Sequence, residues 1–159
     1  MRHIISALVE NKFGVLARIS TLFAARGFNI DSLAVGETEN PDVSRMTIVV
    51  KGDDRTIEQV EKQLNKLIDV IRVNDITKNP HIERDLALIK VSCDKNSRSE
   101  IMQIADIFRS KIIDVAEDAV IVEMTGDEEK VEAIIKMLEP FNIREVCRTG
   151  VIAMARGEK

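Results

Sequence analysis

The sequence has 159 residues, 45% of them apolar and 31% charged, which is enough for one medium domain or two small ones with a substantial core. Its net charge of −4 and its 3% aromatic content, with no Trp or Tyr, argue against nucleic-acid binding, which depends on basic patches and aromatic platforms. No apolar run approaches the roughly 18 residues of a membrane span, and no signal or transit peptide is recognisable, so we expect a cytoplasmic protein.

The first half of the chain alternates strand-like runs with helical stripes of apolar residues. Gly27 is suited to end the first helix, because a glycine after a helix readily adopts positive φ. Asp53 supplies an N-cap for the second helix, and Pro41 lies at the tip of a hairpin loop. The predicted order is strand 4–9, helix 15–26, strand 29–38, strand 44–50, helix 55–68 and strand 71–77.

The second half repeats this order after a polar stretch at 78–81 that contains proline and is the best candidate for a linker. Ser97 and Glu100 have the spacing of a capping box that opens a helix, and Asp127 opens another helix. The predicted order is strand 86–92, a helix with Ile101, Ile104, Ala105 and Phe108 on one face, strands 112–115 and 119–124, a helix with Val131, Ile134, Ile135 and Leu138, and strand 143–154.

The two halves form an internal repeat. Gly52 lies just before the predicted helix 55–68, and Ile57 lies within it. Matching residues recur 74 positions later, as Gly126 and Val131. This pattern predicts an α+β fold of two ferredoxin-like βαββαβ domains in tandem, each an antiparallel sheet with both helices on one face. We assign residues 1–78 to the first domain, 79–84 to a linker and 85–159 to the second domain. Because the other face of each sheet needs cover, an oligomer is favoured over a monomer.

The sequence offers no recognisable catalytic or metal site. His3 lies in a predicted strand and His81 in the predicted linker, and neither lies near a nucleophile motif. There is no glycine-rich nucleotide-binding loop. Cys93 and Cys147 have no CxxC spacing, so we expect a buried, reduced pair and no zinc site.

The stretch from Val9 to Val35 organises the first domain, and its centre is the turn at 10–14 that opens the first helix. A helix N-terminus presents unpaired backbone N–H groups and a partial positive charge, and Gly14 has no Cβ to block a close approach. Such a turn suits a small anion such as a carboxylate. The structural alternative is that Asn11 simply caps the helix while Gly14 eases the turn. The residues of the turn leave both interpretations open.

An enzymatic alternative rests on the run from Gly14 to Arg18, which loosely resembles the G-V-x-x-R part of the acylphosphatase signature. In that family an arginine and loop amides hold a phosphate. The sequence before Gly14 does not resemble the family, and an arginine at this place is more often a solvated helix residue.

Two neighbouring stretches resemble an ACT domain, a small-ligand sensor of amino-acid metabolism: Asn11-x-x-Gly14-Val15-Leu16-x-Arg18-Ile19 and Arg26-Gly27-Phe28-Asn29-Ile30. The resemblance extends over essentially the whole chain to the regulatory (small) subunit of acetolactate synthase, also called acetohydroxyacid synthase. It is carried further by Asp31-Ser32-Leu33-Ala34-Val35-Gly36, by residues 44–50, by Glu83-Arg84-Asp85-Leu86-Ala87-Leu88 and by Arg148-Thr149-Gly150. ACT domains often have proline before the glycine of the turn, where this sequence has Phe13.

The resemblance implies a non-catalytic protein of branched-chain amino-acid biosynthesis. The large subunit of that family joins pyruvate into acetolactate with thiamine diphosphate, magnesium and FAD. The small subunit raises this activity and confers feedback inhibition, typically by L-valine. Two ACT domains pair side by side in a homodimer, and the effector lies at their interface. We therefore expect no cofactor on this chain and a catalytic large subunit as its partner.

The resemblance also implies which residues form the effector site. Backbone N–H groups of Gly14, Val15 and Leu16 would bind the carboxylate, while Asn11 and the partner chain's Asn29 would accept hydrogen bonds from the ammonium group. The apolar wall for a branched side chain would consist of Val15, Leu16, Ile30, Leu33 and Val35. A free-standing amino-acid sensor of another target remains an alternative.

Overall fold

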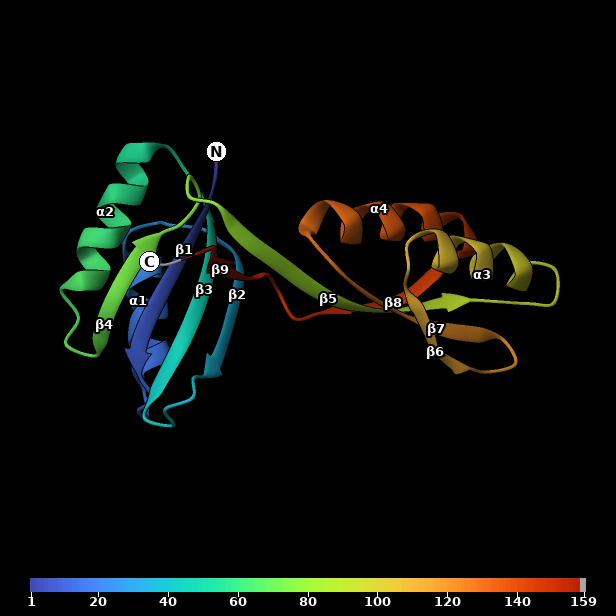
Figure 1. Cartoon of the computed structure of the whole chain (residues 1–159), viewed down its shortest axis with the longest axis horizontal. Helices are drawn as coiled ribbons and strands as arrows, with labels where there is room; N and C mark the ends of the chain where they lie inside the picture. Colours follow the sequence, from blue (N-terminus) through green and yellow to red (C-terminus); the bar gives the residue numbers. More distant parts are fainter. Residues whose placement is uncertain (158–159) are drawn as a thin grey trace. The chain divides into compact units, whose positions relative to one another are not determined.

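The computed structural model describes residues 1–157, which divide into two compact units (Figure 1). Unit 1 contains Met1–Ile82 together with the C-terminal segment from Val151 onward, and unit 2 contains Glu83–Gly150. Within residues 1–157, no helix is long and apolar enough to cross a membrane.

Unit 1 is built on a four-stranded antiparallel sheet with the strand order β2-β3-β1-β4 (Figure 1). The two central strands pair along their whole length, from Arg2 opposite Lys51 to Glu10 opposite Val43. Strands β2 and β4 therefore form the two edges. The elements are β1 (Arg2–Glu10), α1 (Val15–Ala25), β2 (Ile30–Glu37), β3 (Val43–Lys51), α2 (Asp54–Asn65) and β4 (Val70–Asp75).

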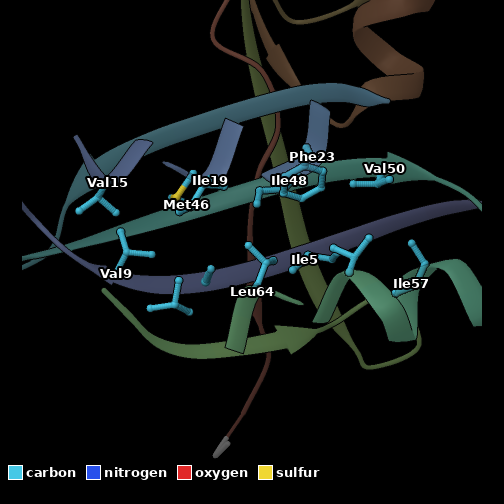
Figure 2. Packing of buried hydrophobic residues seen from close by; sticks show 13 residues of the cluster. Ile5, Val9, Val15, Ile19, Phe23, Met46, Ile48, Val50, Ile57 and Leu64 are labelled. Atoms are coloured by element: carbon cyan, nitrogen blue, oxygen red, sulfur yellow. The ribbon is translucent and has the colours of Figure 1, made fainter. Parts of the chain in front are cut away.

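The core of unit 1 lies between its two helices and one face of the sheet (Figure 2). The helices contribute apolar residues at spacings of three and four, and the strands contribute alternate residues, as the sequence pattern requires. Burying one such side chain stabilises the fold by about 1.5–3 kcal/mol, so this cluster holds both helices on the sheet. Its buried members are Ile5, Ala7, Val9, Val15, Ile19, Phe23, Met46, Ile48, Val50, Ile57, Val60, Leu64 and Val70.

The opposite face of the unit 1 sheet is covered by the C-terminal strand β9 (Ile152–Ala155). The Val151 N–H group donates to Ser32 Oγ at 3.0 Å, and the Arg156 N–H group donates to Pro80 O at 2.8 Å. The buried residues of this second cluster are Ile4, Val49, Ile76, Val151 and Ala153.

Unit 2 repeats the architecture of unit 1. Its sheet has the order β6-β7-β5-β8, which is equivalent to β2-β3-β1-β4, and both helices pack on one face of it. The predicted α+β fold of two βαββαβ domains in tandem is therefore confirmed. The elements are β5 (His81–Ser92), α3 (Arg98–Ile107), β6 (Lys111–Val115), β7 (Ala119–Gly126), α4 (Glu128–Leu138), the 3-10 helix η1 (Glu139–Phe141) and β8 (Ile143–Arg148).

The end of the chain differs from the sequence prediction. The strand predicted at 143–154 is divided into β8 and β9, because Gly150 between them has φ 83°, a left-handed conformation that interrupts an extended strand. The segment after Gly150 packs in unit 1, whereas the sequence analysis placed 85–159 in one domain; residues 158 and 159 lie outside the described part. The predicted linker at 79–84 differs as well, since β5 already begins at His81.

The start of α3 also differs from the predicted capping box. The Ser97 side chain makes no cap hydrogen bond. The Asp94 carboxylate instead accepts from the N–H groups of Asn96 and Ser97, both at 2.8 Å, while Ser97 Oγ accepts from the Asp94 N–H group at 3.0 Å. The predicted caps of α2 and α4 are confirmed: Asp53 and Asp127 each accept from the N–H group three residues ahead, at 2.7 and 2.9 Å.

Candidate functional site

The candidate site is the turn that connects β1 to α1. Gly14 is the N-cap residue of α1, with φ 84° and ψ −5°. This left-handed conformation favours glycine, because a Cβ would be strained there. The interpretation that Asn11 caps the helix is wrong, since Gly14 occupies the N-cap position and no side-chain cap hydrogen bond forms there within the described residues. The Asn11 Nδ2 group donates instead to Pro41 O at 2.8 Å and to Glu37 Oε1 at 3.2 Å.

Some backbone N–H groups at this turn remain available for a ligand, including two of the three that were predicted to bind a carboxylate. Neither the Gly14 nor the Leu16 N–H group has an acceptor within residues 1–157. The Val15 N–H group donates to Lys12 O at 3.4 Å, which is a long and weak hydrogen bond. These groups lie at the positive end of the α1 dipole, where an anion is stabilised. A Cβ added at Gly14 would have Arg18 Nη2 as its single neighbour within 4 Å, at 3.8 Å, so the space around this Cβ position is nearly empty.

Two cationic side chains flank the turn, and each is paired with a carboxylate. Lys12 Nζ lies 3.0 Å from Glu10 Oε2, and this hydrogen bond together with Coulomb attraction raises the pKa of the Lys12 ammonium group. Arg18 forms an ion pair with Asp69, whose side chain is nearly buried. The spacing of four residues between Gly14 and Arg18 predicts that Arg18 lies near the turn. Sequence reasoning missed Asp69, because it is 51 positions from Arg18 and only folding brings the two together.

The apolar residues predicted for the site lie in different environments. Val15 is 4% exposed and belongs to the core, so only its backbone is accessible at the turn. Leu16 and Val35 are about half exposed, at 46% and 47%. Ile30 and Leu33 are half-buried and pack against the core. The three β2 residues pair with core positions of β3, so they lie on the side of the sheet that carries the helices.

Within one protomer, the predicted site residues of β2 lie at two ends of that strand. The end at Glu37 adjoins the turn, since Glu37 accepts from Asn11. Ile30 lies seven residues earlier, which is about 23 Å along an extended strand. Asn29, just before it, is exposed and donates through Nδ2 to Asp31 Oδ1 at 3.4 Å. Asn29 and Ile30 therefore do not meet the Gly14 turn of the same chain.

Two other groups of residues that the sequence singled out lie in unit 2. Asp85, which is 1% exposed, accepts from Arg148 Nε at 3.0 Å and so joins β5 to the end of β8. Cys93 and Cys147 are both free thiols. The expectation that both are buried is wrong for Cys147, because it lies opposite Leu88 on the face of the sheet that carries no helix.

Among residues 1–157, no group of three or more His, Cys, Asp or Glu side chains could hold a metal ion.

Both halves of the chain match known protein families. Residues 5–72 match the family described as the AHAS small subunit-like ACT domain. Residues 84–157 match the family described as the small subunit of acetolactate synthase. The boundary between the two matches falls close to the boundary between the two units at Ile82.

Relatives of similar length resemble the chain from end to end. The probable acetolactate synthase small subunit of Archaeoglobus fulgidus is 55% identical over 159 residues, covering 100% of this chain and 99% of the relative. The acetolactate synthase small subunit of Aquifex aeolicus is 53% identical over 156 residues, covering 98% of this chain and 81% of the relative. The crystal structure of the acetolactate synthase small subunit from Thermotoga maritima has a TM-score of 0.91 and 48% identity, and the match covers 100% of this chain and 99% of that one.

Proposed function

Because the chain belongs to the family of acetolactate synthase small subunits, we propose that it activates the catalytic large subunit and confers feedback inhibition by L-valine. A regulatory role is supported by relatives that share its full length. Carboligation of pyruvate then takes place on the large subunit, with thiamine diphosphate, magnesium and FAD bound there. This chain contributes regulation in the cytoplasm and holds none of these cofactors.

The observation that carries the proposal is the turn at Gly14, which has N–H groups without an acceptor at the N-terminus of α1 and little around its Cβ position. The valine carboxylate accepts hydrogen bonds from the Gly14 and Leu16 N–H groups. Asn11 uses its Nδ2 group to bind Pro41 O and Glu37, so its Oδ1 atom remains as an acceptor for the valine ammonium group.

A second copy of the chain completes this site. β2 is an edge strand, so one row of its backbone N–H and C=O groups is unpaired within residues 1–157. When a partner adds its own β2 antiparallel to this edge, the beginning of the partner strand comes to the Glu37 end of the first strand. The partner's Asn29 and the partner's Ile30 thereby approach the Gly14 turn. A two-fold axis gives two equivalent sites.

The apolar wall of the site sets its selectivity. Leu16 and Val35 of one protomer, with the partner's Ile30 and the partner's Leu33, enclose the branched side chain, while the Val15 side chain is buried in the core and takes no part in the wall. One methylene in an apolar pocket changes binding by about 1–3 kcal/mol. Leucine and isoleucine should therefore bind more weakly than valine without being rejected. Inhibition further requires that valine bind one arrangement of the dimer or its complex more tightly than another.

Reconstitution tests this function directly. The purified chain is mixed with its large subunit, and acetolactate formation is measured with and without valine. We expect the chain to stimulate the large subunit and valine to reverse the stimulation. A chain that binds valine in calorimetry but does not stimulate would instead be a free-standing sensor. Hydrolysis of an acyl phosphate by the isolated chain would support the acylphosphatase alternative, which the pairing of Arg18 with Asp69 disfavours.

A further inference from the structure

The outer surface of unit 1 has a groove between α1 and α2 that the proposed effector site does not use. Two adjoining hollows of 460 and 380 Å³ form it, and they share Arg26 and Gln63. We call this surface the α1/α2 groove. It begins at Ala17 and Arg18, one helical turn after Gly14, and continues to Lys66 near the end of α2.

The floor of the α1/α2 groove is apolar, and the α1 residues along its side have small side chains. Leu22 and Leu67 are half-buried and rest on the core beneath them. Ala17, Thr21 and Ala25 follow one another at a spacing of four residues and present small side chains, which lets another helix approach closely. The Thr21 hydroxyl donates to Ala17 O at 2.8 Å, so its hydrogen-bond donor is already used within α1.

The rim of the α1/α2 groove is basic, although the whole chain is acidic. Its lining includes four cations, Arg18, Arg26, Lys62 and Lys66, and no Asp or Glu, whereas the chain carries 27 acidic and 23 basic residues. Arg18 and Lys62 have carboxylate partners. Arg26 and Lys66 form no ion pair within residues 1–157. An acidic partner is therefore complementary to this groove.

We propose that the α1/α2 groove docks an acidic amphipathic helix of the catalytic large subunit, with apolar residues on the floor and carboxylates against Arg26 and Lys66. This inference rests on the proposed function, and it names the surface through which valine binding at the effector site affects the large subunit. Arg18 belongs both to the groove and to the effector site. It lines the groove, and its Nη2 atom lies 3.8 Å from the position that a Cβ added at Gly14 would take. A carboxylate bound at the turn competes with Asp69 for Arg18 and so changes one end of the groove.

Charge reversal and steric filling test the groove in the reconstituted complex. The double variant Arg26→Glu, Lys66→Glu reverses the rim, and Ala25→Trp fills the space above the floor. Arg55→Glu is the matched control, because Arg55 is an exposed cation of α2 that does not line the groove. Stimulation of the large subunit is titrated at low and high ionic strength, and valine binding to each full-length variant is measured by calorimetry.

For the double variant, we expect the concentration that gives half-maximal stimulation to rise by roughly tenfold or more, with a weaker dependence on salt. Ala25→Trp should raise this concentration too, while Arg55→Glu stimulates like the parent and all variants bind valine like the parent. If both groove variants stimulate at the parent concentration, the groove is not the docking surface, although the proposed function stands. If the parent chain itself fails to stimulate or bind the large subunit, the proposed function fails and this inference falls with it.

Discussion

At the scale of single residues, the turn depends on backbone conformation more than on side chains. Gly14 adopts φ 84°, and Phe13, in the position where ACT domains often have proline, is fully exposed. The side chain before the glycine therefore makes little contact with the rest of unit 1. What the turn presents to a ligand is a set of N–H groups, and these are fixed by the conformation of Gly14 and by the start of α1.

We expect Gly14→Asp to abolish the valine response while the chain still folds and still stimulates the large subunit. The added carboxylate occupies the place of the ligand carboxylate, and the left-handed conformation costs about 1 kcal/mol of stability. The measurement is valine binding by calorimetry together with valine inhibition in the reconstituted enzyme.

The matched control for this variant is Gly157→Asp. Gly157 follows β9, has φ 75°, and has no neighbour within 4 Å of an added Cβ, so the substitution imposes similar strain and the same charge outside the residues of the effector site and of the α1/α2 groove. The control should keep its valine response. A Gly14→Asp chain that responds to valine like the parent would contradict the site assignment.

At the scale of elements, the start of α3 shows how a carboxylate from the preceding loop can take the place of a predicted capping box. The S-x-x-E pattern at Ser97 satisfies the sequence rule for a capping box, in which the Glu100 side chain would accept from the Ser97 N–H group. In the structure the Asp94 carboxylate accepts from that N–H group, and from the N–H group of Asn96 as well. Hydrogen bonds from Ser97 and Asn96 hold the pKa of the Asp94 carboxyl below its ordinary value. The carboxylate form is thus the one that stabilises this turn.

We therefore expect Asp94→Ala to lower the denaturant midpoint of unit 2 more than Ser97→Ala does at pH 7. Because the pKa of Asp94 is lower in the folded state than in the unfolded state, its contribution is present above about pH 4 and is lost as the pH falls below that value. The difference between the parent and Asp94→Ala should accordingly shrink in acid. Urea unfolding of both variants at pH 7 and pH 3 measures this, and an equal loss for the two variants would restore Ser97 as the cap.

At the scale of the whole molecule, the C-terminal segment makes unit 1 depend on residues at both ends of the sequence. A βαββαβ sheet leaves one face open, and β9 covers that face in unit 1 through a contact that spans 119 positions. Unit 1 should therefore lose stability when the segment after Gly150 is altered, even though that segment follows the whole of unit 2.

The pair Val151→Asp and Ile152→Asp tests this dependence. Val151 is 2% exposed, so a carboxylate there should destabilise unit 1 by about 3 kcal/mol. Ile152 is 57% exposed, and the same substitution should change stability by less than about 0.5 kcal/mol. Hydrogen exchange followed by mass spectrometry reports each unit separately. Faster exchange in unit 2 alone for Val151→Asp would contradict the observed packing.

The amino-acid sequence alone determined the features that local patterns carry. Apolar spacing specified two βαββαβ domains, and the acidic caps at Asp53 and Asp127 marked the starts of α2 and α4. The glycine at position 14 and the helix after it specified a turn suited to an anion. These features depend on residues within one or two turns of each other, so a linear pattern is sufficient to find them.

The tertiary structure alone decided the features that join distant residues. It paired Arg18 with Asp69, placed β9 on the open face of unit 1, and assigned Val15 to the core while Leu16 stayed exposed. It also separated Asn29 from the Gly14 turn by most of the length of β2. The physical reason is that such contacts follow from how sheets and helices pack in three dimensions, and side chains 50 or 100 positions apart leave no periodic signal in the sequence.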